Sequence, residues 1–261
     1  MDDKFPDGMD AGLTGWADPV ARLRQAIEKD EFALYCQPIL GLAAGGYPLG
    51  EILVRMREEE SAMLPPGDFL PVLKHYGMLP QFDRWEVRNA LQALAAGSRI
   101  PRLTVNVSEQ TLADAAFLDY VAAQLAAQKI APERLLFEID ENDVLGRPEA
   151  TTAFAAGCRK VGVGVLIDGF GRRAVSFAVI KGIAADFIKV DGIVTRKILG
   201  NEIARNKMDA IVRVSQTLRF AVIAECVESE DVLTRLQEIG VGYAQGFGVY
   251  EPFPIERFAR A

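Results

Sequence analysis

Acidic and amide side chains recur within or at the end of the short apolar runs of this sequence, and their types indicate the chemistry that the chain can perform. Four of them, in successive runs, are Glu51, Asn106, Glu138 and Asp168. An alternating core pattern does not produce such a series, because a buried charge is costly unless it is paired or bound to a metal. These side chains offer only oxygen ligands, which suit a hard divalent ion, Mg²⁺ or Mn²⁺, better than zinc. Further polar residues in comparable positions are Ser108, Asp140, Glu141, Lys189, Asp191, Glu225, Glu228 and Gln245.

Each of these residues also has a simpler interpretation when it is taken alone. A single acid at the end of a strand is more often a helix cap or an ion-pair partner than a ligand. We assign Asp140, Asp143 and Glu230 to that class. Lys189 alone could pair with a neighbouring aspartate. The metal-site interpretation therefore depends on the whole set of residues.

The remaining composition excludes several other chemistries. The chain of 261 residues has one histidine, His75, which we interpret as a solvated helix end. Sites with several imidazole ligands are therefore excluded. The three cysteines, Cys36, Cys158 and Cys226, form no CxxC pair, which predicts buried free thiols. Acidic residues outnumber basic ones by 36 to 29, a formal net charge of −7, so we expect no binding to DNA or RNA.

An α/β scaffold is predicted to position the polar residues. Apolar runs alternate with helical patterns, which is typical of a parallel sheet with helices outside it. About eight runs in a chain of this length favour a closed (β/α)8 barrel, in which functional groups gather at the carboxyl ends of the strands. The predicted strands are residues 32–39, 49–55, 103–107, 135–139, 161–168, 187–191, 221–227 and 242–249. The predicted helices include residues 69–74, 82–96, 117–128, 150–160, 206–218 and 230–239.

The chain is predicted to hold one domain. Residues 1–17 are rich in Asp, Gly and Pro and show no periodicity, so we interpret them as a tail or linker before a domain at 18–261. Asp18 and Pro19 open an amphipathic helix as its cap and first-turn proline. The amino terminus does not resemble a signal peptide, and the apolar runs are too short to span a bilayer. We therefore expect a cytoplasmic protein without direct membrane insertion.

A run of short motifs resembles the bacterial EAL domain, which hydrolyses cyclic di-GMP to linear pGpG. Residues 51–55, Glu-Ile-Leu-Val-Arg, are similar to the E-A-L-x-R signature of that family. Each motif is weak alone, but seven or more in chain order are specific, and the resemblance runs from about residue 20 to residue 254. The other matches are Gln37-Pro38, Asp83-Arg84-Trp85, Asn106-Val107-Ser108, Glu138-Ile139-Asp140-Glu141, Lys189-Val190-Asp191, Ala224-Glu225-Cys226-Val227-Glu228 and Gln245-Gly246-Phe247.

The resemblance implies a fold and a set of residue roles. The fold would be a modified TIM barrel with one antiparallel strand, and homodimers and fusion to GGDEF or sensor domains would be common. Catalysis would be two-metal phosphodiester hydrolysis. The implied metal ligands are Glu51, Asn106, Glu138 and Asp168. Lys189 and Glu225, with Glu51, would be catalytic, and Gln37, Arg55 and Gln245 would bind the nucleotide. Glu141 would anchor the loop after the fifth strand. Asp191 and Glu228 would support the site by contacting the residues that bind the metal or the substrate.

The loop after the fifth strand departs from the family pattern. The family has D-D-F-G-T-G, whereas this chain has Asp168-Gly169-Phe170-Gly171-Arg172-Arg173. Glycine offers no side-chain oxygen, so the second cation loses a ligand. The Glu of a family A-E motif is also replaced, by Lys74.

Two principal functions follow from this departure. The first is a cyclic di-GMP phosphodiesterase, a hydrolase slowed by the loss at Gly169. The alternative is an impaired EAL domain that binds cyclic di-GMP as a receptor. A third, more distant function is that of an unrelated TIM-barrel enzyme acting on a phosphorylated metabolite. Arg172 or Arg173 could partly replace the missing cation in binding, since guanidinium groups bind phosphate bidentately; otherwise both point into solvent.

Overall fold

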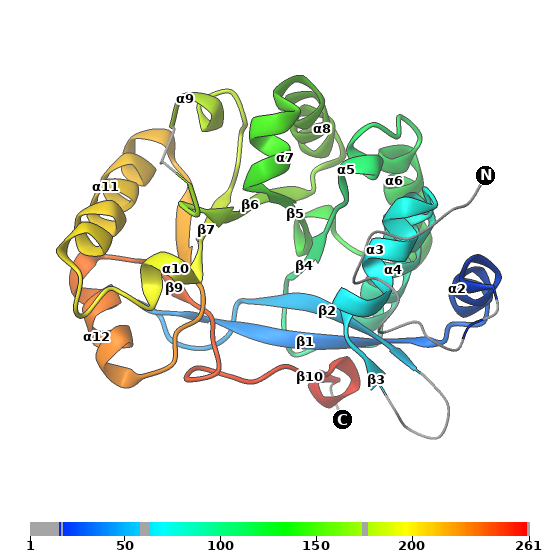
Figure 1. The fold of residues 1–261 in the computed structure, drawn as a ribbon, viewed down its shortest axis with the longest axis horizontal. Helices are drawn as coiled ribbons and strands as arrows, with labels where there is room; N and C mark the ends of the chain where they lie inside the picture. The colour runs from blue at the N-terminus through cyan, green and yellow to red at the C-terminus, as the bar shows by residue number, and fades with distance from the viewer. Residues whose placement is uncertain (1–15, 17, 58–62, 174–176, 260–261) are drawn as a thin grey trace.

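The sheet closes into a barrel in the computed structural model, which describes residues 16, 18–57, 63–173 and 177–259. In this part of the chain eight strands pair in a ring, and β1 is antiparallel to both of its neighbours. The other neighbouring strands in the ring are parallel. The predicted fold, with its one antiparallel strand, is therefore confirmed (Figure 1). The ring is β1 (Phe32–Gly41), β2 (Leu49–Arg57), β4 (Leu103–Asn106), β5 (Leu135–Asp140), β6 (Gly164–Phe170), β7 (Phe187–Val190), β8 (Ala221–Ala224) and β9 (Tyr243–Ala244), with β3 (Met63–Leu64) and β10 (Phe253–Pro254) at its margin.

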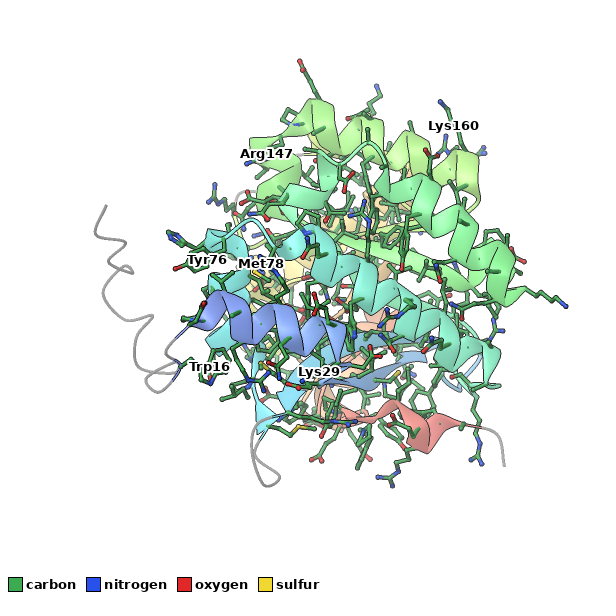
Figure 2. All side chains as sticks on the ribbon, turned by 90° about the vertical axis from the view of Figure 1, so that its right-hand side faces the viewer. Trp16, Lys29, Tyr76, Met78, Arg147 and Lys160 are labelled. Atoms are coloured by element: carbon green, nitrogen blue, oxygen red, sulfur yellow. The ribbon has the colours of Figure 1, made fainter. Side chains whose placement is uncertain are left out.

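Helices surround the barrel, and several lie in a row on one side of it. Figure 2 shows α2, α4, α6 and α8 side by side over this face. Asp18 caps α2 by accepting a hydrogen bond from Ala21 N at 2.9 Å, as the sequence predicts. The helices are α2 (Pro19–Glu28), α3 (Pro66–His75), α4 (Leu79–Ala95), α5 (Glu109–Leu112), α6 (Phe117–Gln128), α7 (Glu141–Gly146), α8 (Pro148–Val161), α9 (Phe177–Ile180), α10 (Gly192–Thr195), α11 (Glu202–Leu218) and α12 (Glu230–Ile239), with the 3₁₀ turns η2 (Pro132–Arg134) and η3 (Ile255–Phe258). Among the described residues, no helix combines the length and the apolar character that a bilayer span requires.

The interior of the barrel has an apolar layer and a polar layer. Alternate residues of a strand point to the same face, so a strand can contribute to both layers with residues two positions apart. In the parallel strands the polar residue comes two positions after the apolar one, and in the antiparallel β1 it comes two positions before. The apolar layer is Ile39, Leu49, Leu136, Leu166, Phe187 and Ile223, packed with Tyr243. The corresponding polar residues are Gln37, Glu51, Glu138, Asp168, Lys189, Glu225 and Gln245.

Three predicted strands have an end that is wrong by three or more residues, and glycine or turn geometry explains two of these differences; the other strand ends differ by one or two residues. Residues 161–163 do not begin β6, because α8 continues to Val161 and ends at Gly162, whose φ of +90° stops the helix. The last strand covers only residues 243–244, because Val249 N and Tyr250 N both bond Gly246 O and turn the chain. Strand β8 ends at Ala224, before the segment that carries Glu225.

The predicted helix at 206–218 begins earlier than expected. Helix α11 starts at Glu202, where the side chain of Asn201 accepts a hydrogen bond from Ala204 N at 2.9 Å. The cysteines are free; Cys36 and Cys158 are buried as predicted, whereas Cys226 is partly exposed.

Candidate active site

The buried ammonium group of Lys189 lies at the centre of the polar layer. Its side chain is 1% exposed, and its Nζ donates to Glu138 Oε2 and, at 2.9 Å, to Glu51 Oε2. Asp168 Oδ1 lies 3.6 Å from the same nitrogen. Burial would lower the pKa of Lys189, but the three carboxylates outweigh it and hold the pKa well above its usual value. The lysine is therefore a permanent cation between three acids.

Two amide side chains and one hydroxyl fix the orientation of these carboxylates. Gln245 Nε2 donates to Glu51 Oε2 at 2.6 Å and to Gln37 Oε1 at 3.1 Å. Asn106 Nδ2 lies 3.4 Å from Glu51 Oε1, and Thr104 Oγ1 donates to Glu138 Oε1. These contacts join side chains of neighbouring strands into one group, which we call the Lys189 cluster: Lys189, Glu51, Glu138, Asp168, Asn106, Gln37 and Gln245.

The cluster contains more acid than base. Burial and the charge of Glu51 raise the pKa of Glu138 to about 8, although Lys189 opposes the shift. Burial also raises the pKa of Asp168. Asp168 Oδ1 is a buried oxygen without a hydrogen-bond donor. An additional cation would satisfy both the excess charge and this oxygen.

The residues fit one divalent ion better than two. Among the described residues no three carboxylate, thiol or imidazole side chains already converge as metal ligands, and Lys189 lies between the acids instead. The donor set of carboxylates and an amide is nevertheless the one that Mg²⁺ or Mn²⁺ prefers, and Asp168 Oδ1 is unsatisfied. Gly169 supplies no side-chain ligand, so the loop after β6 does not fit a second divalent ion.

The loop after β6 is held by contacts on both sides. Glu141 Oε1 accepts a hydrogen bond from Gly171 N at 3.2 Å, which is the contact that the loop-anchor prediction requires. Lys207 of α11 donates to the carbonyl oxygens of Gly171 and Arg173. Asp140 and Asp191 both bond the side chain of Arg172. Asp140 also caps α7, as we expected for an acid at a strand end.

Glu225 faces a small cavity at the edge of the cluster. Its Oε1 accepts a hydrogen bond from Gly192 N at 2.7 Å, and burial raises its pKa to about 7. The cavity measures about 200 Å³, and its lining includes Glu51, Gln245 and Phe247. Phe247 is 68% exposed, although it is a large aromatic side chain. Such a ring offers a flat face on which a nucleobase can stack.

Two predicted site residues do not reach the cluster. Arg55 is exposed on β2, with its guanidinium 5.0 Å from the centre of the Tyr35 ring. Glu228 is 64% exposed at its side chain and pairs with Arg196 at 3.3 Å, although it lines the same small cavity. His75 ends α3 and is exposed, as the sequence indicates.

Asp83 has a positioning role that the sequence analysis did not assign. Its Oδ2 accepts hydrogen bonds from Ser108 N at 3.0 Å and from Ser108 Oγ at 2.7 Å. These contacts fix the segment that follows β4 and therefore Asn106 two residues before it. The D-x-W motif was the available signal, but a motif does not show which backbone its aspartate holds.

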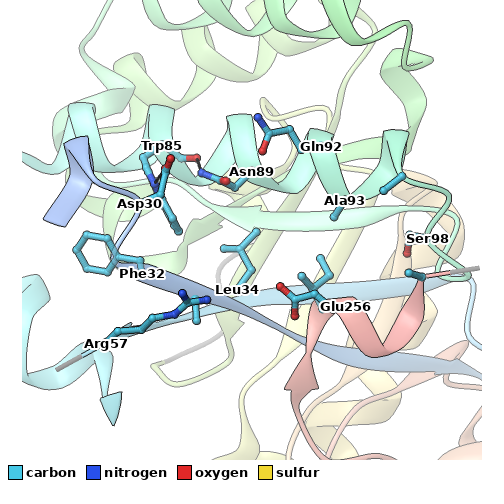
Figure 3. Close-up of a pocket in the computed structure, with 14 residues that line it drawn as sticks. Asp30, Phe32, Leu34, Arg57, Trp85, Asn89, Gln92, Ala93, Ser98 and Glu256 are labelled. Carbon is cyan, nitrogen blue, oxygen red and sulfur yellow. Dashed lines mark hydrogen bonds between the residues drawn. The ribbon is translucent and has the colours of Figure 1, made fainter. Parts of the chain in front are cut away.

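Two larger cavities differ in their relation to the cluster. One, of about 780 Å³, is lined by Asn106, Ser108, Glu109 and Lys74, so it adjoins the cluster at the end of β4, whereas Gln245 follows β9. Lys74 pairs there with Glu109 at 2.9 Å. The other, of about 400 Å³, lies between α4, β1 and η3 and shares no lining residue with the cluster (Figure 3).

The sequence and the fold were compared with known proteins. The EAL domain model matches residues 20–252, almost the whole described chain. The chain belongs to the EAL domain family. The cyclic di-GMP phosphodiesterase PdeF of Escherichia coli is 31% identical over 237 residues, which cover 90% of this chain and 32% of that protein. The cyclic di-GMP phosphodiesterase PdeB of Shewanella oneidensis is 28% identical, over 93% of this chain and 28% of that protein.

Solved EAL structures share the fold of this domain over most of its length. The FimX EAL domain from Pseudomonas aeruginosa bound to c-di-GMP has a TM-score of 0.85 and 28% identity, and the match covers 90% of this chain and 96% of that one. The PaMucR phosphodiesterase in complex with c-di-GMP has a TM-score of 0.84 and 27% identity, over 92% and 98%. This EAL chain spans about a third of the length of the curated relatives.

Proposed function

We propose that this EAL domain binds cyclic di-GMP over the Lys189 cluster and hydrolyses it slowly to pGpG. The observation that carries the proposal is the convergence of Glu51, Glu138 and Asp168 on one buried lysine. Gln245 and Asn106 each donate a hydrogen bond to Glu51. Relatives and structural neighbours are named for cyclic di-GMP hydrolysis or binding. Membership of the EAL domain family and the geometry of the Lys189 cluster both support cyclic di-GMP as the ligand.

The ion of this proposal is Mg²⁺ or Mn²⁺, held by Glu51, Asn106, Glu138 and Asp168. When bound by these residues, an ion of this kind would supply the positive charge that activates water and stabilises charge on the phosphate. Lys189 orients the three acids, and its ammonium would offer a positive charge and a hydrogen-bond donor to a phosphate bound over the cluster. Glu225, whose raised pKa lies near neutrality, accepts or returns a proton at the edge of the cluster.

The cavities on the two sides of the cluster give room for the two halves of the dinucleotide. Phe247 lies in the cavity next to Gln245 and offers a stacking face, and the larger cavity begins at Asn106. Arg55 remains the proposed phosphate contact, although it does not touch the cluster here. Homodimer formation, a cytoplasmic location and fusion to sensor or GGDEF domains remain predictions from the sequence.

A receptor function is the second candidate, and Gly169 favours it. Loss of one ligand can leave nucleotide binding intact while it removes most of the rate, because hydrolysis needs charge stabilisation that binding does not. The two candidates share the binding site and differ only in turnover.

Incubation with cyclic di-GMP and Mn²⁺, followed by chromatography of pGpG, separates the two functions. We expect slow product formation that Glu51→Gln abolishes. The matched control is Glu256→Gln, which removes an exposed carboxylate of η3, outside the cluster (Figure 3). Binding without product would support the receptor function instead, and absence of both binding and product would contradict the proposal.

A further inference from the structure

The side chain of Arg172 fills the space that a side chain at position 169 would need. A Cβ atom added to Gly169 would lie 2.5 Å from Arg172 Nη2, 2.9 Å from Cζ and 3.3 Å from Nη1. Contacts below 3.0 Å require a shift of one partner, so the guanidinium occupies the space that a side chain at position 169 would enter first. Arg173, the next residue, is exposed and offers only its carbonyl oxygen to Lys207.

Two carboxylates hold the guanidinium in this position. Arg172 Nε donates to Asp191 Oδ2 at 2.7 Å, and Nη1 donates to Asp140 Oδ2 at 3.2 Å. The other oxygen of each aspartate is also bound: Asp191 Oδ1 accepts from Ile193 N, and Asp140 Oδ1 accepts from Asn142 N. Both acids are thus fixed at the starts of helices, and they present one oxygen each to Arg172. A guanidinium bonded on two sides is oriented although its side chain is 41% exposed.

The guanidinium lies beside Asp168, one of the proposed ligands of the metal ion. Asp140 and Asp168 are register partners on β5 and β6, so the Asp140–Arg172 pair borders Asp168. Arg172 Nη2 has no hydrogen-bond partner among the described residues. One donor group therefore stays open beside the cluster.

We propose that Arg172 is a built-in cation that takes the place of a second metal ion, and that Gly169 is required to make room for it. This proposal rests on the binding of a first ion at Glu51, Asn106, Glu138 and Asp168. Arginine supplies a positive charge and hydrogen-bond donors for a phosphate, but it cannot coordinate a water and lower its pKa. The domain accordingly binds one divalent ion, holds the nucleotide phosphate partly through Arg172, and turns over slowly.

The two substitutions are coupled in this proposal. A carboxylate introduced by Gly169→Asp alone would meet the guanidinium, pair with it and be neutralised. The single replacement therefore creates no second ion site. Removal of the guanidinium at the same time leaves the new carboxylate with Asp168, Asp140 and Asp191 as free oxygen donors, which a second hard cation can use.

The test counts Mn²⁺ ions bound per chain, by electron paramagnetic resonance or calorimetry, without nucleotide. We expect one ion for the wild type, one for Gly169→Asp and two for Gly169→Asp/Arg172→Ala. Gly169→Asp/Arg172→Met, which keeps an apolar stem in place, serves if the first double variant does not fold. The matched control, Gly169→Asp/Arg173→Ala, removes a neighbouring arginine that bonds neither aspartate and should still bind one ion.

The difference of one ion between the Arg172 and Arg173 double variants tests this inference. Equal counts in the two, or two ions in Gly169→Asp alone, would overturn it. The proposed function is tested separately in the same samples by addition of cyclic di-GMP. A domain that binds no nucleotide but still gains one ion on loss of Arg172 contradicts the proposed function and supports the role of Arg172.

Discussion

Replacement of Lys189 by Met should strongly destabilise the metal-free domain. Methionine is close to lysine in length but carries no charge, so the substitution removes the ammonium without a large cavity. Glu138, which is fully buried at its side chain, then loses its cationic partner, while Glu51 and Asp168 are 14% and 23% exposed and remain partly hydrated. We therefore count one fully buried pair. Breaking such a pair costs about 3–5 kcal/mol, because the remaining charge is left buried.

The assay is urea denaturation in EDTA at pH 8.5, where the carboxyl of Glu138, whose pKa is about 8, is mostly ionised in the wild type. We expect the free energy of unfolding to fall by about 3–5 kcal/mol in Lys189→Met. The control, Lys160→Met, replaces an exposed lysine of α8 and should change stability by less than about 0.5 kcal/mol. Added Mn²⁺ should stabilise Lys189→Met more than the wild type, because the ion replaces the lost charge and ligand binding to the folded state adds stability.

Two results would refute this reasoning. A loss of less than about 1 kcal/mol, close to that of Lys160→Met, would show that the ammonium does not compensate the acids. A full loss that Mn²⁺ leaves unchanged would show that the three acids do not form a cation site.

Three further perturbations test separate parts of the structure. Gly246→Ala places a Cβ atom 2.2 Å from Val227 N and O, so we expect the free energy of unfolding to fall by about 1–3 kcal/mol in thermal or chemical denaturation. The control, Gly200→Ala, has no atom within 4 Å of the added Cβ and should leave the stability unchanged. Burial raises the pKa of Glu86 well above its usual value. Above about pH 4.3, the pKa of an unfolded glutamate, the folded state therefore binds more protons than the unfolded state, and the wild type loses stability as the pH rises. Glu86→Gln should therefore gain stability over the wild type between pH 5 and pH 8, by at most about 1.4 kcal/mol per pH unit, and an equal gain at both values would contradict the burial argument. Glu141→Ala leaves Gly171 N without its hydrogen-bond acceptor, so we expect the free energy of unfolding to fall by about 1–3 kcal/mol and amide hydrogen exchange in the loop after β6 to become faster. An unchanged exchange rate in this loop would contradict the anchoring role of Glu141.

The polar layer of the barrel could be predicted because its geometry is periodic. Glu51, Glu138 and Lys189 each follow an apolar residue by two positions, and a strand places such residues on one face whatever the helices outside do. Gln37 comes two positions before its apolar residue, Ile39, because β1 is antiparallel. The alternation does not show the direction of a strand, and the antiparallel strand was predicted from the family resemblance alone.

Other features depend on contacts that have no period in the sequence. The position of Arg172 follows from Asp140 and Asp191, which approach it from two different strand ends, and no spacing rule connects the three. Arg55 and Glu228 match the expected motifs but lie outside the cluster, because Arg55 is four residues further along β2 than Glu51 and Glu228 lies beyond the end of β8. The end of β9 could not be placed because Gly246 and Gly248 turn the chain through backbone contacts with Val227 and Glu228.

Equilibrium dialysis with cyclic di-GMP in the presence of Mn²⁺ tests the central claim most directly. Chromatography of both compartments at equilibrium counts cyclic di-GMP separately from any pGpG formed, so slow turnover is corrected for. We predict one nucleotide per chain, with affinity at least about tenfold weaker in Glu51→Gln and unchanged in Glu256→Gln. Absence of binding, or equal binding by the wild type and Glu51→Gln, would contradict a nucleotide site at the Lys189 cluster.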